Sequence, residues 1–222
     1  MSLSRLSPQV LLSKEFRESY VAKLKELPNF AFATSSIDLQ YASVLIPLCV
    51  RDGEVQILYT LRSTNLKSHS GQVSFPGGKS DGDESVVKTA LRETEEEIGV
   101  PRESVDVWGV ISNVSGLNKD MIITPVVGEI KDFDFSKLSP NEDEVEEVFT
   151  VPIRSLCDIN THAHYMYLNN PMPMYLYEKH KIWGITGFIT HIFLLNFLPS
   201  ELYSFNFKGS RYDLEELRLS KL

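Results

Sequence analysis

Residues 84–98 restrict the fold more than any other part of the chain. Their inner positions recur at spacings of four, three and four residues: Val87, Leu91, Thr94 and Ile98. This period is typical of an amphipathic helix that packs one face inward. Gly99 follows, and glycine often ends a helix because it adopts a left-handed backbone without steric cost. We therefore expect a helix over 84–98 that packs against a further layer of structure.

Strand-like segments surround this helix. Apolar runs that favour β-structure occupy five ranges: 43–50, 55–61, 105–112, 121–130 and 148–151. Asp52 and Gly53 stand between the first two runs, and Asp-Gly at such a place indicates a tight hairpin. Residues 62–83 are polar and rich in glycine, which favours a loop.

Outside this region the pattern is less regular. Helical or strand spacing recurs in four further segments: helices at 9–27 and 185–198, and short strand pieces at 165–168 and 174–178. We find no internal repeat and no low-complexity linker. The sequence therefore predicts a single α/β (α+β) domain over 1–222, with an N-terminal helix and a C-terminal extension over 199–222.

The charge balance excludes some functions. The net charge is −8 at pH 7, so the chain offers no basic field for a nucleic-acid backbone and we expect no nucleic-acid partner. An anionic substrate would need bound cations. The longest apolar stretch, 185–198, is too short to span a bilayer, so we expect no membrane span. Cys49 and Cys157 have apolar neighbours, which favours buried free thiols.

The chain ends in Ser220, Lys221 and Leu222. A C-terminal Ser-Lys-Leu is an address that the peroxisomal import receptor reads. The alternative is an amphipathic C-terminal helix that happens to end in these residues. We favour the address, which predicts a peroxisomal location and the import receptor as a partner.

Carboxylates gather on the outer face of the predicted helix. Glu93 lies three residues before Glu96 and four before Glu97, so the three side chains share one face. Like charges at this spacing destabilise a helix, and a divalent cation would remove that cost. Mg²⁺ and Mn²⁺ prefer carboxylate oxygen. A solvated acidic face is the alternative, and the glutamates alone would favour it.

The segment from Gly78 to Val100 resembles the Nudix box. Residues of the expected type stand at the box spacing: Gly78, Glu84, Arg92, Glu93, Glu96, Glu97, Gly99 and Val100. One position departs, since Thr94 stands where the family prefers an apolar side chain. The resemblance implies a Nudix hydrolase domain over about 38–198, with a mixed β-sheet sandwiched between helices. Members of the family cleave a nucleoside diphosphate linked to another group.

The same resemblance implies roles for the box residues. Glu93, Glu96 and Glu97 look like the ligands of Mg²⁺ or Mn²⁺. Arg92 looks like the residue that orients a glutamate through a salt bridge, and Glu84 looks like an outer carboxylate.

Hydrolysis also needs a group that takes a proton from the attacking water. The family often supplies it from a distant loop. Our candidate is Glu144, which precedes the predicted strand at 148–151. Glu142, Glu146 and Glu147 remain alternatives.

A second pattern precedes the box and bears on the substrate. It resembles the additional signature of the peroxisomal coenzyme A diphosphatase subfamily in these residues: Leu58 to Ser63, Lys67, Gly71 and Phe75 to Gly78. Tyr59 replaces a leucine of that signature, and Lys67 replaces an arginine, which keeps the charge and loses the bidentate fork. The resemblance implies coenzyme A and acyl-CoA as substrates, cleaved to 3′,5′-ADP and (acyl-)4′-phosphopantetheine.

Cations for such a substrate are available near the box. Arg62, Lys67 and Lys79 cluster in the loop before it, and we expect them to contact phosphates. The alternative is that they are surface charges. Gly77 and Gly78 would let the backbone approach the phosphates closely.

Two other functions remain open. The first is a Nudix hydrolase that acts on NADH or ADP-ribose, although the chain lacks the four cysteines of a zinc site. The second is a non-catalytic Nudix domain that binds a nucleotide. Retention of Glu93, Glu96 and Glu97 argues against the second.

Overall fold

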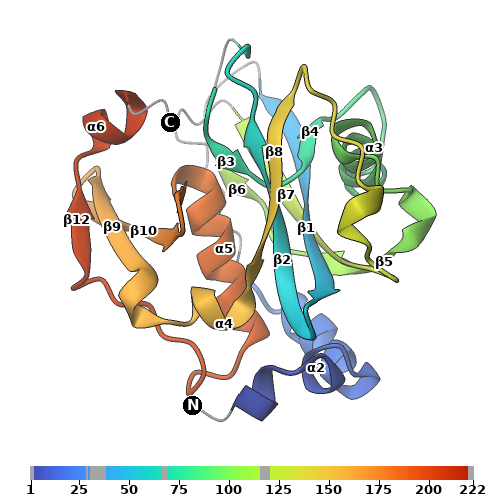
Figure 1. Ribbon diagram of the computed structural model, residues 1–222, viewed down its shortest axis with the longest axis horizontal. Coiled ribbons are helices and arrows are strands. Elements are labelled where there is room, and N and C mark those ends of the chain that lie inside the picture. Colours follow the sequence, from blue (N-terminus) through green and yellow to red (C-terminus); the bar gives the residue numbers. More distant parts are fainter. Residues whose placement is uncertain (1–2, 29, 31–38, 67–69, 116–120, 220–222) are drawn as a thin grey trace.

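A mixed sheet of eight strands forms the centre of the molecule (Figure 1). The computed structural model describes residues 3–28, 30, 39–66, 70–115 and 121–219. The strands of this sheet are β1 Gln40–Arg51, β2 Glu54–Arg62, β3 Val73–Ser74, β4 Gly77–Lys79, β5 Val105–Val110, β6 Val114–Ser115, β7 Met121–Ile130 and β8 Val145–Pro152. The order is β3-β2-β1-β7-β5, with β4 on β1, β6 on β7 and β8 on β2.

The sheet is mixed because β1 and β7 run parallel while the other pairs are antiparallel. The predicted hairpin is confirmed. Asp52 and Gly53 both have positive φ, 53° and 75°, as a two-residue turn of this twist requires.

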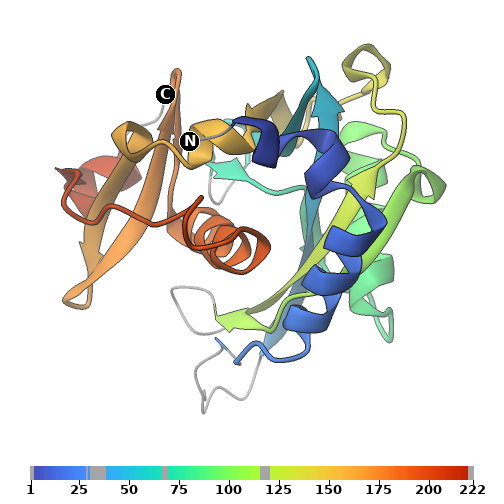
Figure 2. The same ribbon diagram turned by 90° about the horizontal axis from the view of Figure 1, so that it is seen from below.

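Helices cover both faces of the sheet. The described α-helices, of which α2, α3 and α5 cover this sheet, are α1 Pro8–Leu11, α2 Lys14–Leu24, α3 Val86–Ile98, α4 Ile153–Leu156, α5 Gly184–Phe197 and α6 Leu214–Leu219. Leu45 and Leu58 pack on one face in a cluster with Ile98 of α3. On the other face, Ile46 and Ile57 belong to the cluster that holds α2 and α5 (Figure 2). The predicted sandwich of helices around a mixed sheet is confirmed.

The N-terminal helix differs from its prediction. A single helix was expected over 9–27, and the structure has α1 and α2 with a break between them. Ser13 causes the break, because its extended backbone places its side chain to accept a hydrogen bond from the Phe16 amide and so to begin α2.

A second sheet of four strands follows the first and was not predicted as a sheet. Its strands are β9 His162–Tyr167, β10 Asn170–Tyr177, β11 His180–Ile182 and β12 Ser210–Tyr212, in the order β11-β10-β9-β12. The C-terminal extension supplies β12 and α6. Leu217 of α6 packs on Tyr165 and Met174, so the extension is part of the folded structure.

Two sequence expectations about burial and membranes can be compared with these elements. Cys49 and Cys157 are both buried and unpaired, as predicted. Among the described residues, no helix is both long and apolar enough to cross a membrane.

Candidate active site

The carboxylate of Glu97 lies at the meeting point of α3, β2 and β4. It is almost fully buried, with 2% of the residue exposed. The Gly77 amide donates a hydrogen bond to its Oε2 over 3.2 Å, and Arg62 Nη1 lies 3.8 Å from its Oε1. The fold thus brings together one predicted metal ligand and two predicted substrate-binding residues from three separate elements.

Both ends of α3, the helix that carries Glu97, are set by residues next to it in the sequence. Ser85 begins the helix by accepting a hydrogen bond from the Lys88 amide. Gly99 ends it in the left-handed conformation, with φ 72°. The predicted helix is therefore confirmed, starting at Val86 and ending at Ile98.

Two glycines allow β4 to approach the acidic side chains. A Cβ on Gly78 would overlap the carboxylate of Glu93. A Cβ on Gly77 would overlap the backbone of β1 at Ser43 and Val44, and Gly77 also has a φ of 149° that disfavours other residues. The glycines make the close approach of strand and helix possible.

Arg92 organises the outer part of the acidic cluster. Its Nη1 donates to Glu93 over 2.9 Å and to Glu96 over 3.0 Å. Its Nη2 donates to Glu84 over 3.2 Å and to the backbone carbonyl of Lys79 over 3.1 Å. One guanidinium thus holds three carboxylates and one end of β4, which is the arrangement expected of an orienting arginine.

Hydrogen bonding and burial divide the carboxylates into two kinds. The hydrogen bond from Arg92 lowers the pKa of Glu84, to which Thr89 also donates. Burial, by contrast, raises the pKa of Glu93. Burial raises the pKa of Glu97 to about 8, against the opposing effects of Gly77 and Arg62. The anion of Glu84 is thus stabilised, whereas burial disfavours the anions of Glu93 and Glu97.

Glu144 lies close enough to this site to act on it electrostatically. Its charge contributes to the raised pKa of both Glu93 and Glu97. The hydrogen bond from the Ser63 amide to its backbone carbonyl, 2.8 Å long, ties it to the end of β2. Among the alternatives, the Oε2 atom of Glu147 lies 2.8 Å from Nζ of Lys179 and 3.3 Å from Nε2 of His180. Glu142 and Glu146 are exposed.

The donor set has the chemistry that a hard divalent cation requires, because it consists of carboxylate oxygens. Its geometry is not that of a closed metal site. Among the described residues, no group of three His, Cys, Asp or Glu side chains converges to hold a metal ion. Glu96 is 55% exposed and faces Arg92, so it would have to leave this ion pair to join Glu93 and Glu97.

The three basic residues that were predicted to contact the substrate differ in their surroundings. Arg62 has a buried Nε without a hydrogen-bond partner among the described residues, and a quarter of its side chain is exposed. Lys79 is exposed, and it is its carbonyl that takes part in the site. Lys67 lies outside the described residues.

Sequence reasoning missed two contributors to the site. Thr89 donates to Glu84 over 3.0 Å, and the Lys79 carbonyl accepts from Arg92. Thr89 lies five residues after Glu84 on the same helical region, so its position carried a usable signal. A backbone carbonyl carries none, because every residue has one.

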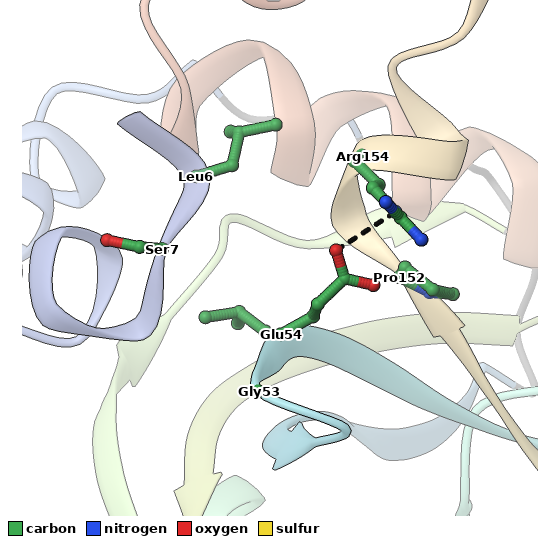
Figure 3. Close-up of a pocket in the computed structure, with 7 residues that line it drawn as sticks. Leu6, Ser7, Gly53, Glu54, Pro152 and Arg154 are labelled. Carbon is green, nitrogen blue, oxygen red and sulfur yellow. Dashed lines mark ion pairs between the residues drawn. The ribbon is translucent and has the colours of Figure 1, made fainter. Parts of the chain in front are cut away.

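A pocket of about 120 Å³ lies elsewhere, beside the turn between β1 and β2 (Figure 3). Gly53 and Glu54 line it together with Arg154, which pairs with Glu54 over 3.0 Å. It is at the opposite end of β2 from Arg62. It is also smaller than the several hundred Å³ typical of ligand pockets, so we do not assign it to a nucleotide substrate.

Comparison with known proteins identifies relatives over most of the chain. The family model for the NUDIX domain matches residues 40–168. The mitochondrial coenzyme A diphosphatase NUDT8 of Mus musculus is 40% identical over 168 residues, which cover 71% of this chain and 78% of that protein. Nudix hydrolase 3 of Caenorhabditis elegans is 36% identical over 212 residues, which cover 86% and 88%.

These relatives correct one prediction. The NUDT8 proteins of Mus musculus and Homo sapiens are named mitochondrial, so the expectation of a peroxisomal location is wrong. It depended on Ser220, Lys221 and Leu222, which lie outside the described residues. Three residues are a short motif that arises readily by chance, and we do not propose the import receptor as a partner.

Proposed function

The chain belongs to the Nudix hydrolase family, and on that premise we propose that it hydrolyses the pyrophosphate bond of coenzyme A and acyl-CoA derivatives. The products are 3′,5′-ADP and 4′-phosphopantetheine or its acyl form. The observation that carries the choice of substrate is the signature over residues 58–78. Relatives at 40% identity that are named coenzyme A diphosphatases support it.

The charge of the substrate determines what the site must do. A pyrophosphate repels a nucleophile because its oxygens are anionic. When bound, Mg²⁺ or Mn²⁺ neutralises these oxygens and makes water a better nucleophile. Glu93, Glu96 and Glu97 would hold the cation. Burial raises the pKa of both Glu93 and Glu97, so a nearby cation would stabilise both carboxylates, and this supports the assignment.

Residues of this chain supply the other functions. Glu144 takes the proton of the attacking water in our assignment, since it lies within electrostatic range of Glu93 and Glu97. Arg62 is partly exposed beside Glu97 and would bind a phosphate oxygen, with Lys67 and Lys79 adding positive charge. Gly77 and Gly78 let β4 lie against β1 and the Glu93 carboxylate, which keeps the acidic side chains beside this strand. Attack at either phosphorus gives the same two products.

The first experiment measures product formation from three substrates. Purified protein is incubated with coenzyme A, NADH or ADP-ribose, each with and without Mg²⁺ or Mn²⁺, and the products are separated by chromatography. We expect 3′,5′-ADP only from coenzyme A and only with metal. Glu97→Gln should lower the rate by about a hundredfold or more, because it removes a charged ligand.

A matched variant on the same helix provides the control. Glu95 pairs with Arg102 over 2.6 Å, and Glu95→Gln makes the same chemical change without touching Glu97. We expect nearly normal turnover from it. Cleavage of NADH or ADP-ribose in place of coenzyme A would show that this Nudix hydrolase acts on a different substrate. If no substrate is cleaved with metal present, the non-catalytic alternative takes precedence.

A further inference from the structure

A column of stacked rings crosses the interior behind the acidic site. The ring of Tyr59 lies 4.9 Å from that of Phe75 and 5.8 Å from that of Phe149, and both pairs are stacked. His180 of β11 continues the column at 3.7 Å from Phe149. Tyr59 is fully buried at the centre of this column, so its ring is fixed from two sides.

The hydroxyl of Tyr59 reaches a helix of the C-terminal half. It lies 3.0 Å from the hydroxyl of Thr190 on α5, which in turn donates to the Thr186 carbonyl over 2.9 Å. One turn earlier, the Thr186 hydroxyl donates to the Val73 carbonyl of β3 over 3.0 Å. Two side-chain contacts therefore fasten α5 to the two neighbouring strands β2 and β3.

These two strands lead directly into the site. Arg62 lies three residues after Tyr59 on β2, and Gly77 lies two residues after Phe75. Both contact Glu97, Arg62 through an ion pair and Gly77 through its amide. A shift of the strand pair would therefore move both partners of Glu97 together.

We propose that Tyr59 is a positioning residue, which locks α5 onto β2 and β3 through Thr190 and thereby fixes Arg62 and Gly77 around Glu97. Leucine, the residue of the resembled signature at this position, could fill the core but could not make this bond. Positioning matters here because small displacements of groups around a reacting centre lower rates strongly. The effect on catalysis rests on the proposed function, whereas the effect on geometry does not.

The test removes the bond from either side and measures the site directly. Tyr59→Phe deletes one hydroxyl, and Thr190→Val deletes the other at nearly constant volume. Amide hydrogen exchange of metal-free protein is followed by NMR at Gly77 and at amides in the centre of β1 and β7. We expect exchange at Gly77 to become about five- to tenfold faster in both variants, since one hydrogen bond is lost. Exchange within β1 and β7 should change less.

A second buried tyrosine offers the control. Tyr20 is 1% exposed, and its hydroxyl has no partner among the described residues. Tyr20→Phe makes the same substitution in the same core, and it should leave Gly77 exchange and turnover within about twofold of the wild type.

Turnover of coenzyme A with Mg²⁺ provides the second readout. We expect kcat/KM to fall about tenfold in Tyr59→Phe and in Thr190→Val, and no further in the double variant, because the same bond is removed. Unchanged exchange at Gly77, or equal acceleration at all amides, would overturn the positioning role. Selective acceleration at Gly77 in a protein that does not cleave coenzyme A would support positioning and refute the proposed substrate.

Discussion

Glu97 is buried, and in the proposed reaction it would have to act as an anion to bind a cation. Burial raises its pKa to about 8, so most molecules carry a proton on Glu97 at neutral pH when no metal is present. The folded state therefore binds this proton more tightly than the unfolded chain, whose glutamate titrates near 4.5. Stability from this group is complete below pH 4.5 and is lost as the pH rises through 8.

Replacement of Glu97 by glutamine should remove this loss. Glutamine still accepts the hydrogen bond from Gly77 and carries no charge. In EDTA, we expect Glu97→Gln to be more stable than the wild type at pH 9, by roughly a few kcal/mol, and nearly equal at pH 5. Thermal unfolding between pH 5 and 9 measures the difference. Parallel curves for the two proteins would contradict the cause that we assign to the shift.

At the scale of elements, the contact between β4 and α3 determines whether the acidic side chains are correctly placed. Alanine at Gly78 would have ordinary backbone geometry and a Cβ that overlaps the Glu93 carboxylate. We expect Gly78→Ala to lower turnover by about a hundredfold, since small displacements cost this much, while the melting temperature falls only by a few degrees. Gly82→Ala should show the reverse, because its Cβ meets open space and its φ of 54° strains alanine. Equal loss of activity in both variants would show that the overlap is not the cause.

The elements that the sequence predicts well are those with local signals. The helix α3 has a helical period and a terminal glycine, and the hairpin of β1 and β2 has its Asp-Gly turn. The second sheet gave signals only for two of its strand pieces. The pairing of β12 with β9 has no local signal, because it is parallel and joins residues that are far apart in the chain. Ser13 shows a signal that was present and overlooked, since serine before a helical period is a common cap.

The residues of the site likewise divide into those that local spacing predicts and those that it does not. Spacing along one helix places Glu93, Glu96 and Glu97 on one face. The approach of Arg62 to Glu97 joins residues that are far apart in the sequence, and the sequence predicted for Arg62 only a contact with substrate phosphates. Lys79 shows the limit of predicting contacts from side-chain chemistry. Its charge suggested a substrate contact, whereas its backbone carbonyl accepts a hydrogen bond from Arg92.

At the scale of the whole molecule, Glu97 and two histidines of the C-terminal half give the stability opposite dependences on pH. The C-terminal half contains His162, which is buried, and His191, which is partly buried. Burial lowers the pKa of both, and that of His191 falls to about 4, with a further contribution from His162. Since the unfolded chain binds these protons more tightly, stability is complete above pH 6.5 and is lost as the pH falls toward 4. Together with the opposite trend of Glu97, this predicts a stability maximum near neutral pH in metal-free protein.

A substitution at His191 separates the two limbs of this profile. The Nδ1 atom of His191 lies 2.7 Å from the hydroxyl of Tyr203, and asparagine would place its carbonyl oxygen near the same point without a titrating ring. We expect His191→Asn to flatten the acid limb, recovering up to about 3 kcal/mol of the stability that wild type loses between pH 7 and 4.5. The alkaline limb should stay unchanged, because Glu97 lies on α3, which packs on the opposite face of the eight-stranded sheet from α5. Chemical denaturation of the metal-free protein at pH 4.5, 7 and 9 measures both limbs. A variant that loses stability in acid as steeply as wild type would place the acid sensitivity in other groups. A change in the alkaline limb would show that His191 and Glu97 are electrostatically coupled.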